Sequence, residues 1–139
     1  MTTSCLEIIS AINDCEVEAM QKAGRELDPS LPQSCEKFRC HVRGVQAMIV
    51  YNYKLTAYAS VREPSPEKAA KLWEDMISLC DKAIQVLCGL KDLYPGCGTA
   101  ETFDLALDYR GAAQERYLQD LEDSKCRTPT PVGLFPRKN

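Results

Sequence analysis

Residues 65–90 read SPEKAAKLWEDMISLCDKAIQVLCGL, and apolar side chains recur in them at steps of three and four. That spacing gathers the apolar side chains on one face of an α-helix. Ser65 is a favourable N-cap and Pro66 a favourable first helical residue, and the turn-forming residues 94–98 follow the pattern. The segment therefore predicts an amphipathic helix through about Leu93. Its apolar face consists of Ala69, Leu72, Trp73, Met76, Cys80, Ala83, Leu87 and Leu90.

The same helical period appears in three further segments, at about residues 4–27, 32–61 and 99–123. Short runs rich in proline, glycine and serine separate them. Cys15 falls on the apolar stripe of the first of these segments and Leu107 on that of the last. Ser4 with Glu7 fits a capping box for the first segment, and Ser30 with Gln33 offers one for the second. Thr99 is the expected cap of the last. Residues 48–53 include β-forming types, so a strand is conceivable there, but the length of the surrounding pattern favours a helix.

Four helices with short connections favour packing as antiparallel neighbours. We therefore predict an all-α fold, an antiparallel four-helix bundle of up-down-up-down topology over residues 1–123. Gly111 lies inside the fourth helix, where glycine costs roughly 1 kcal/mol relative to alanine, which points to a close helix–helix crossing. Residues 124–139 contain three prolines and no helical period. They predict an extended C-terminal tail whose Leu134 and Phe135 form an apolar docking cluster.

Length and composition place the chain among soluble single-domain proteins. It has 139 residues, of which 45% are hydrophobic and 27% charged, and a net charge of −3. That charge is too balanced to favour nucleic acid or an anionic membrane as the main partner. Neither a secretory signal pattern nor a membrane-spanning run is apparent, so we expect a cytoplasmic protein.

Eight cysteines are many for a chain of this length. Several fall on apolar helical stripes, and free cysteine often packs as a small buried hydrophobe. In a chain without a secretory signal we therefore expect mostly reduced core thiols, with disulfides or a metal as the alternatives. An oxidised protein would favour an exported context.

The residue types exclude several kinds of chemistry. His41 is the only histidine, so a di-iron carboxylate bundle or a hemerythrin-like site cannot be built. Paired zinc-type cysteines are missing as well, although Cys35, Cys40 and His41 could supply metal ligands with help from facing helices. The glycines around Cys97 lack a Walker lysine and fit a helix connection. We expect no cofactor and no enzymatic activity.

The distribution of charge is the most informative pattern. Residues 32–62 hold five basic side chains and one acid, Glu36, whereas the segments before and after are net negative. The second helix could attract its neighbours within the bundle. It could instead present a basic face with Tyr51, Tyr53 and Tyr58 to an acidic protein, and nucleic acid is the least favoured option. Extra apolar residues on the third helix suggest homodimerisation through the second or third helix.

These observations predict a non-enzymatic bundle that acts by protein–protein interaction, as an adaptor, chaperone-like protein or scaffold. The predicted binding surface combines Arg39, Arg43 and Lys54 with Leu134 and Phe135, and its partner is an acidic protein. The alternative is a thiol- or metal-binding or redox-sensing bundle that uses Cys35, Cys40 and His41.

Overall fold

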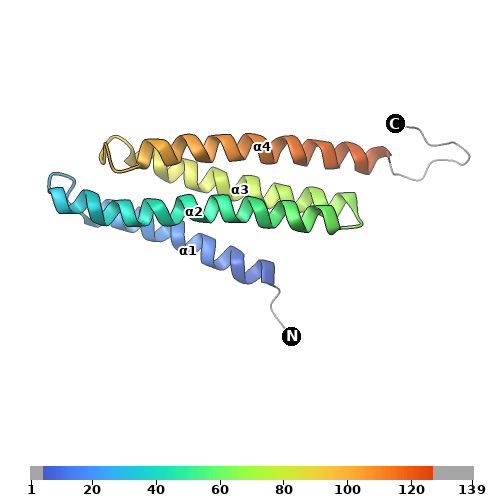
Figure 1. The fold of residues 1–139 in the computed structure, drawn as a ribbon, viewed down its shortest axis with the longest axis horizontal. Helices are drawn as coiled ribbons and strands as arrows, with labels where there is room; N and C mark the ends of the chain where they lie inside the picture. The colour runs from blue at the N-terminus through green and yellow to red at the C-terminus, as the bar shows by residue number, and fades with distance from the viewer. Residues whose placement is uncertain (1–4, 127–139) are drawn as a thin grey trace, which may run out of the picture.

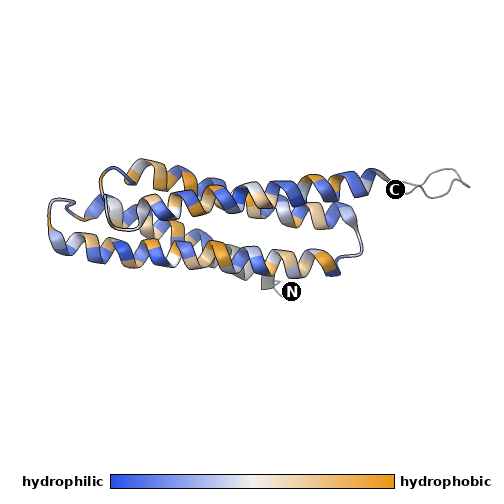
Figure 2. Ribbon diagram, turned by 45° about the horizontal axis from the view of Figure 1, so that its top comes forward, coloured by the Kyte–Doolittle hydropathy of each residue, from blue (hydrophilic) through white to orange (hydrophobic). Residues whose placement is uncertain are grey.

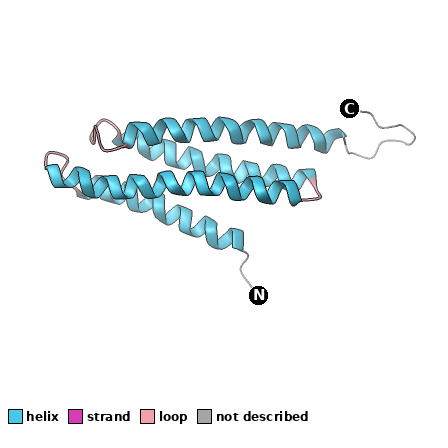
Figure 3. Ribbon diagram, in the orientation of Figure 1, coloured by secondary structure: helices cyan, strands magenta, loops and turns pink. Residues whose placement is uncertain are grey.

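Four α-helices make up the part of the chain that the computed structural model describes, residues 5–126, with side chains from 13 to 125. They are α1 (Cys5–Glu26), α2 (Pro32–Arg62), α3 (Pro66–Leu90) and α4 (Thr99–Cys126). No strand occurs in this range (Figure 3). The predicted all-α fold of four packed helices is confirmed, and residues 48–53 are helical. The predicted end of the last helix at residue 123 is wrong, because α4 continues through residues 124–126. Ser4 of the predicted capping box and the rest of the predicted tail, with Leu134 and Phe135, lie outside the described residues.

The starts of α2 and α3 show how local sequence sets helix boundaries. Ser65 caps α3 as predicted, because its hydroxyl accepts a hydrogen bond of 3.3 Å from the backbone N–H of Lys68. The predicted capping box at Ser30 is wrong. The N-cap of α2 is Leu31, which provides no side-chain hydrogen bond. The N–H and hydroxyl of Ser30 instead donate to the Asp28 carboxylate, at 3.0 and 2.8 Å, and these bonds close the turn before the helix.

The helices pack unequally. α2 and α3 each contact all three other helices, and α3 and α4 form the most extensive pair. Among the described residues α1 and α4 do not contact each other. Figure 1 shows α1 leaving the bundle toward its N-terminal end. The largest fully buried side chains come from α1, α2, α3 and the α3–α4 loop, whereas α4 contributes the smaller Thr99 and Thr102. They are led by Trp73, Tyr94, Phe38, Met20, Ile49 and Leu87.

α2 and α4 lie side by side and run in the same direction (Figure 1). Just before α4, a Cβ placed on Gly98 would lie 3.7 Å from Cγ1 of Val42. Further along, the rings of Tyr53 and Tyr109 have centroids 5.0 Å apart. Both steps, from Val42 to Tyr53 and from Gly98 to Tyr109, are 11 residues. The two helices therefore keep a constant register, and any residue of α2 can be matched to its level on α4.

Candidate functional site

The side chains of α2 that point away from the core form a basic and aromatic surface, which we call the α2 outer face. Tyr51, Tyr58 and Val61 remain 62%, 60% and 68% exposed, and Figure 2 shows the apolar end of α2. Such a cluster of large exposed side chains beside cations is typical of an interaction surface. The α2 outer face consists of Arg43, Tyr51, Lys54, Tyr58, Val61 and Arg62, all of them exposed.

Arg62 and Tyr58 hold each other in place on this face. The guanidinium carbon lies 3.6 Å from the centroid of the tyrosine ring, within the range of a cation–π interaction. Arg62 also donates a hydrogen bond of 3.1 Å to the backbone carbonyl of Tyr58. The ring and the cation are thus ordered before any partner arrives, which lowers the entropy cost of binding.

Two of the predicted cations belong to the α2 outer face. Arg43 and Lys54 are exposed, and within residues 13–125 neither forms a hydrogen bond or ion pair that would tie it to another helix. The ion pairs between helices join Lys82 to Asp14 and Arg110 to Asp81 instead. Arg43 and Lys54 therefore do not take part in ion pairs between α2 and the neighbouring helices of the described chain.

Tyr53 and Arg39 form contacts within the bundle that the sequence did not predict. Tyr53 is half-buried, with its ring 5.2 Å from Trp73 and 5.0 Å from Tyr109, so it belongs to the core rather than to a binding face. The guanidinium of Arg39 donates a hydrogen bond of 2.8 Å to the carbonyl of Gly96. Arg39 therefore holds the α3–α4 loop against α2.

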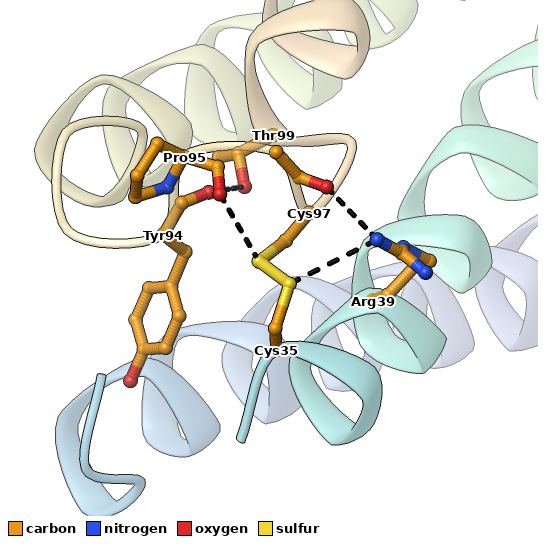
Figure 4. The surroundings of a disulfide bond; sticks show 7 residues. Cys35, Arg39, Tyr94, Pro95, Cys97 and Thr99 are labelled. Atoms are coloured by element: carbon orange, nitrogen blue, oxygen red, sulfur yellow. Dashed lines mark hydrogen bonds between the residues drawn. A yellow bond between two sulfur atoms is a disulfide. The ribbon is translucent and has the colours of Figure 1, made fainter. Parts of the chain in front are cut away.

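A disulfide bond between Cys35 and Cys97 lies beside this contact (Figure 4). It joins the first turn of α2 to the α3–α4 loop, with the two Cα atoms 5.6 Å apart. Arg39 also approaches it, with Nη2 3.8 Å from Sγ of Cys35. The loop turns through Gly96 and Gly98, whose φ angles of +80° and +86° are readily adopted only by glycine.

Tyr94 ties the same loop to α1. Its ring stacks on Phe38 with centroids 4.1 Å apart. Its hydroxyl lies 3.0 and 3.1 Å from the carbonyl oxygens of Gly24 and Leu27, to which it donates. Gly24 lies in the last turn of α1 and Leu27 directly follows the helix, where backbone acceptors lack partners within the helix. Burial raises the pKa of Tyr94, which keeps the hydroxyl protonated as a donor.

Most of the cysteines whose side chains are described are free thiols, as expected, but the expectation that these thiols lie in the core is wrong. Cys80 alone is both free and buried, and burial raises its pKa to about 12. Cys35 and Cys97 are oxidised, and the other free cysteines in this range are exposed: Cys15, Cys40 and Cys88. Helical spacing placed Cys15 on an apolar stripe, but the buried side of α1 carries Asn13 and Val17 instead, and Cys15 lies on the opposite, exposed side of the helix.

The metal-binding alternative would need Cys35 as a thiolate, and here its sulfur is bonded to Cys97. Cys40 is exposed and His41 is half-buried. In the described part of the chain no group of three His, Cys, Asp or Glu side chains could hold a metal ion. A site at Cys35, Cys40 and His41 stays a prediction that requires the disulfide to be reduced first.

A cleft of about 300 Å³ opens between α1, α2 and α3, where α1 leaves the bundle. At its wall the amides of Asn13 and Asn52 exchange two hydrogen bonds, of 2.7 and 2.9 Å. Lys82 forms an ion pair with Asp14 at 2.7 Å, which raises the pKa of the lysine. Asp75 is paired with Lys71 at 3.1 Å. Because these polar groups already have partners, the cleft offers no unpaired charge to a ligand or a reacting group.

A second exposed surface, the α4 outer face, was not predicted. Leu107 was expected on the buried stripe but is 43% exposed, and Leu118 is 53% exposed. Apart from Lys125, every exposed charged side chain of α4 is acidic. The acidic residues that recur at helical spacing in the fourth segment were the signal in the sequence that could have revealed this surface. The α4 outer face consists of Glu101, Asp104, Leu107, Asp108, Gly111, Glu115, Leu118 and Glu122.

Comparison of the chain with protein-family models, with curated proteins and with solved structures gives no match. In the described range no helix is both long and apolar enough to cross a membrane. The functional assignment therefore rests on the surfaces and contacts described above.

Proposed function

We propose that the four helices form an antiparallel bundle of up-down-up-down topology, and that the protein acts without enzymatic activity, as an adaptor, chaperone-like protein or scaffold that binds another protein. The observation that carries the proposal is the α2 outer face. It combines Arg43 and Lys54, which have no acidic partner within residues 13–125, with the large exposed side chains Tyr51, Tyr58 and Val61. Tyrosine and arginine are enriched among residues that dominate binding energy.

The chemistry of this face defines its partner. The only acid in α2 is Glu36, near the start of the helix, so cations dominate from Arg43 to Arg62. A protein surface with carboxylates around exposed aliphatic side chains would complement both the charges and the rings. Five basic residues spread along a long helix are too sparse for nucleic acid to be the favoured partner.

A photo-crosslinking amino acid at position 51 tests the proposal, with the same residue at Gln85 on α3 as the matched exposed control. We expect a protein adduct from position 51 and none from position 85. Arg43→Glu/Lys54→Glu should abolish the adduct and leave the circular dichroism spectrum unchanged. Equal labelling from both positions, or an adduct that survives charge reversal, would contradict the proposed surface. Arg39→Glu is expected to lower stability instead, because it breaks the contact with Gly96.

The Cys35–Cys97 bond favours redox sensing as a second candidate function. A dithiol reductant that supplies two electrons and two protons would convert the bond to two thiols and release the α3–α4 loop from α2. Hydrogen exchange at residues 94–98 should then increase in the reduced protein, while exchange in the middle of α3 stays constant. Identical exchange in both states would refute a sensing role.

The Cys35–Cys97 disulfide is also relevant to the cellular compartment in which the protein resides. Disulfides persist in oxidising environments and are rare in the cytosol. The cytoplasmic location stays a prediction, and the Cys35–Cys97 bond argues against it. Alkylation of the protein in its native cells, followed by mass determination, would show whether Cys35 and Cys97 are paired there.

A further inference from the structure

We infer that the protein partner of the α2 outer face is the α4 outer face of a second copy of this chain, in a two-fold symmetric dimer. This inference rests on the proposed function and names its partner. Three observations carry it: the opposite charges of the two faces, their matching register, and an open glycine on α4.

The charges are complementary. Between Arg43 and Arg62 the α2 outer face carries cations and no acid. On α4, Arg110 is bonded to Asp81 of α3 and Arg116 lies over the ring of Trp73, 4.8 Å from its centroid. These internal contacts remove the arginines from the α4 surface and leave its exposed carboxylates in excess. Two copies would each supply one basic and one acidic face, and opposite potentials favour and orient association.

The register matches the exposed side chains in pairs. Since Tyr53 is level with Tyr109, Tyr51 is level with Leu107, and Arg62 is level with Leu118. Lys54 falls about 3 Å along the axis from Asp108. If α2 pairs in parallel with the α4 of a second copy, without a shift along the axis, the ring of Tyr51 therefore meets Leu107 and the ammonium group of Lys54 lies beside the carboxylate of Asp108. We call this α2–α4 contact between two copies a seam.

Gly111 lies between these levels. It is exposed, and a Cβ placed on it would meet nothing within 4 Å. Within the described residues, the predicted close crossing at Gly111 is therefore not made. An exposed glycine that no described residue covers allows a partner helix or ring to approach the backbone closely. Gly111 faces outward at a level between those of Tyr51 and Tyr58.

The arrangement within one copy permits closed symmetry. Because α2 and α4 are adjacent and parallel, a two-fold axis parallel to both would place each α2 opposite the partner's α4 without a shift along the helices. Two equivalent seams form, and the assembly closes at two copies instead of growing into a fibre.

Sedimentation equilibrium with charge-swap variants tests the dimer. Lys54→Glu and Asp108→Lys should each raise the dissociation constant by about tenfold or more. The double variant Lys54→Glu/Asp108→Lys should restore dimerisation, because both seams regain opposite charges. Lys22→Glu reverses the charge of an exposed side chain on α1. It is the matched control and should not change the dissociation constant. Raising the salt concentration from about 50 to about 500 mM should weaken the wild-type dimer.

Glycine substitutions provide an independent readout. Gly111→Leu should abolish the dimer, whereas Gly89→Leu on exposed α3, where a Cβ also meets nothing within 4 Å, should preserve it. A wild-type protein that is monomeric at about 100 µM would overturn the dimer, as would a double charge swap that dimerises no better than the single variants. If such a monomer still gives a crosslinked adduct from position 51 with another protein, only this inference fails. If it gives none, the proposed function fails with it.

Discussion

Removing the Cys35–Cys97 bond is expected to cost this bundle a large part of its stability. The bond links residues 62 positions apart. In the chain-entropy description, a cross-link over a loop of that length stabilises the folded state by about 4 kcal/mol, because it restricts the unfolded chain. Natural domains have a total stability of about 5–15 kcal/mol. The variant Cys35→Ser/Cys97→Ser should therefore remain folded, but its free energy of unfolding should lie close to the lower limit of that range.

Urea unfolding followed by circular dichroism would measure this loss. The midpoint of thermal unfolding should fall by roughly 10 to 15 °C for a domain of this size. Wild-type protein with excess dithiothreitol should behave like the variant, since both lack the cross-link. Cys40→Ser/Cys88→Ser changes two exposed free thiols and should shift stability by less than about 0.5 kcal/mol.

Two results would refute this reasoning. Equal unfolding midpoints for oxidised wild type and Cys35→Ser/Cys97→Ser would show that the cross-link contributes nothing. Alkylation of Cys35 and Cys97 in unfolded protein without any reductant would show that the bond itself is missing.

Three further predictions concern the core. Asn13→Ala should cost about 1–3 kcal/mol, because it leaves the Oδ1 of buried Asn52 without a donor, while its Nδ2 keeps the bond to the carbonyl of Met48. The double alanine variant should cost less than the sum of the single changes in a urea-unfolding cycle. Tyr94→Phe should cost about 1–2 kcal/mol and speed hydrogen exchange at the C-terminal end of α1. The unfolded Cys80 thiol ionises near pH 9.0, whereas the folded thiol keeps its proton to about pH 12. Stability should therefore fall as pH rises from 9.0 by up to about 1.4 kcal/mol per pH unit, and pH titration of unfolding should show this slope reduced in Cys80→Ala.

The helices were predictable because their signals are local. Ser65 and the apolar spacing after it define the start and the buried side of α3 without reference to any other segment. The same spacing placed Arg43 and Lys54 on an outward face. Leu107 was misassigned because an apolar residue at the edge of a stripe can lie on either side of the boundary between core and solvent.

The contacts between distant segments were not predictable in this way. The bond between Cys35 and Cys97 depends on which helix end meets which loop, and eight cysteines allow many pairings. Arg39 was read as a surface cation, because nothing near it in the sequence shows that the carbonyl of Gly96 lies within reach. The pairing of Asn13 with Asn52 likewise joins two amides that are 39 residues apart.

Helix α1 is held at its C-terminal end and leaves the bundle at its N-terminal end (Figure 1). One end is held by the hydrogen bonds from Tyr94 to the carbonyls of Gly24 and Leu27. Further along, Asn13 and Asp14 supply the polar contacts with α2 and α3. A helix of 22 residues is about 33 Å long, so a rotation of only about 5° about the fastened end displaces the far end by about 3 Å. The width of the cleft beside Asn13 therefore follows the angle of α1, and the polar contacts of Asn13 and Asp14 help to hold that angle.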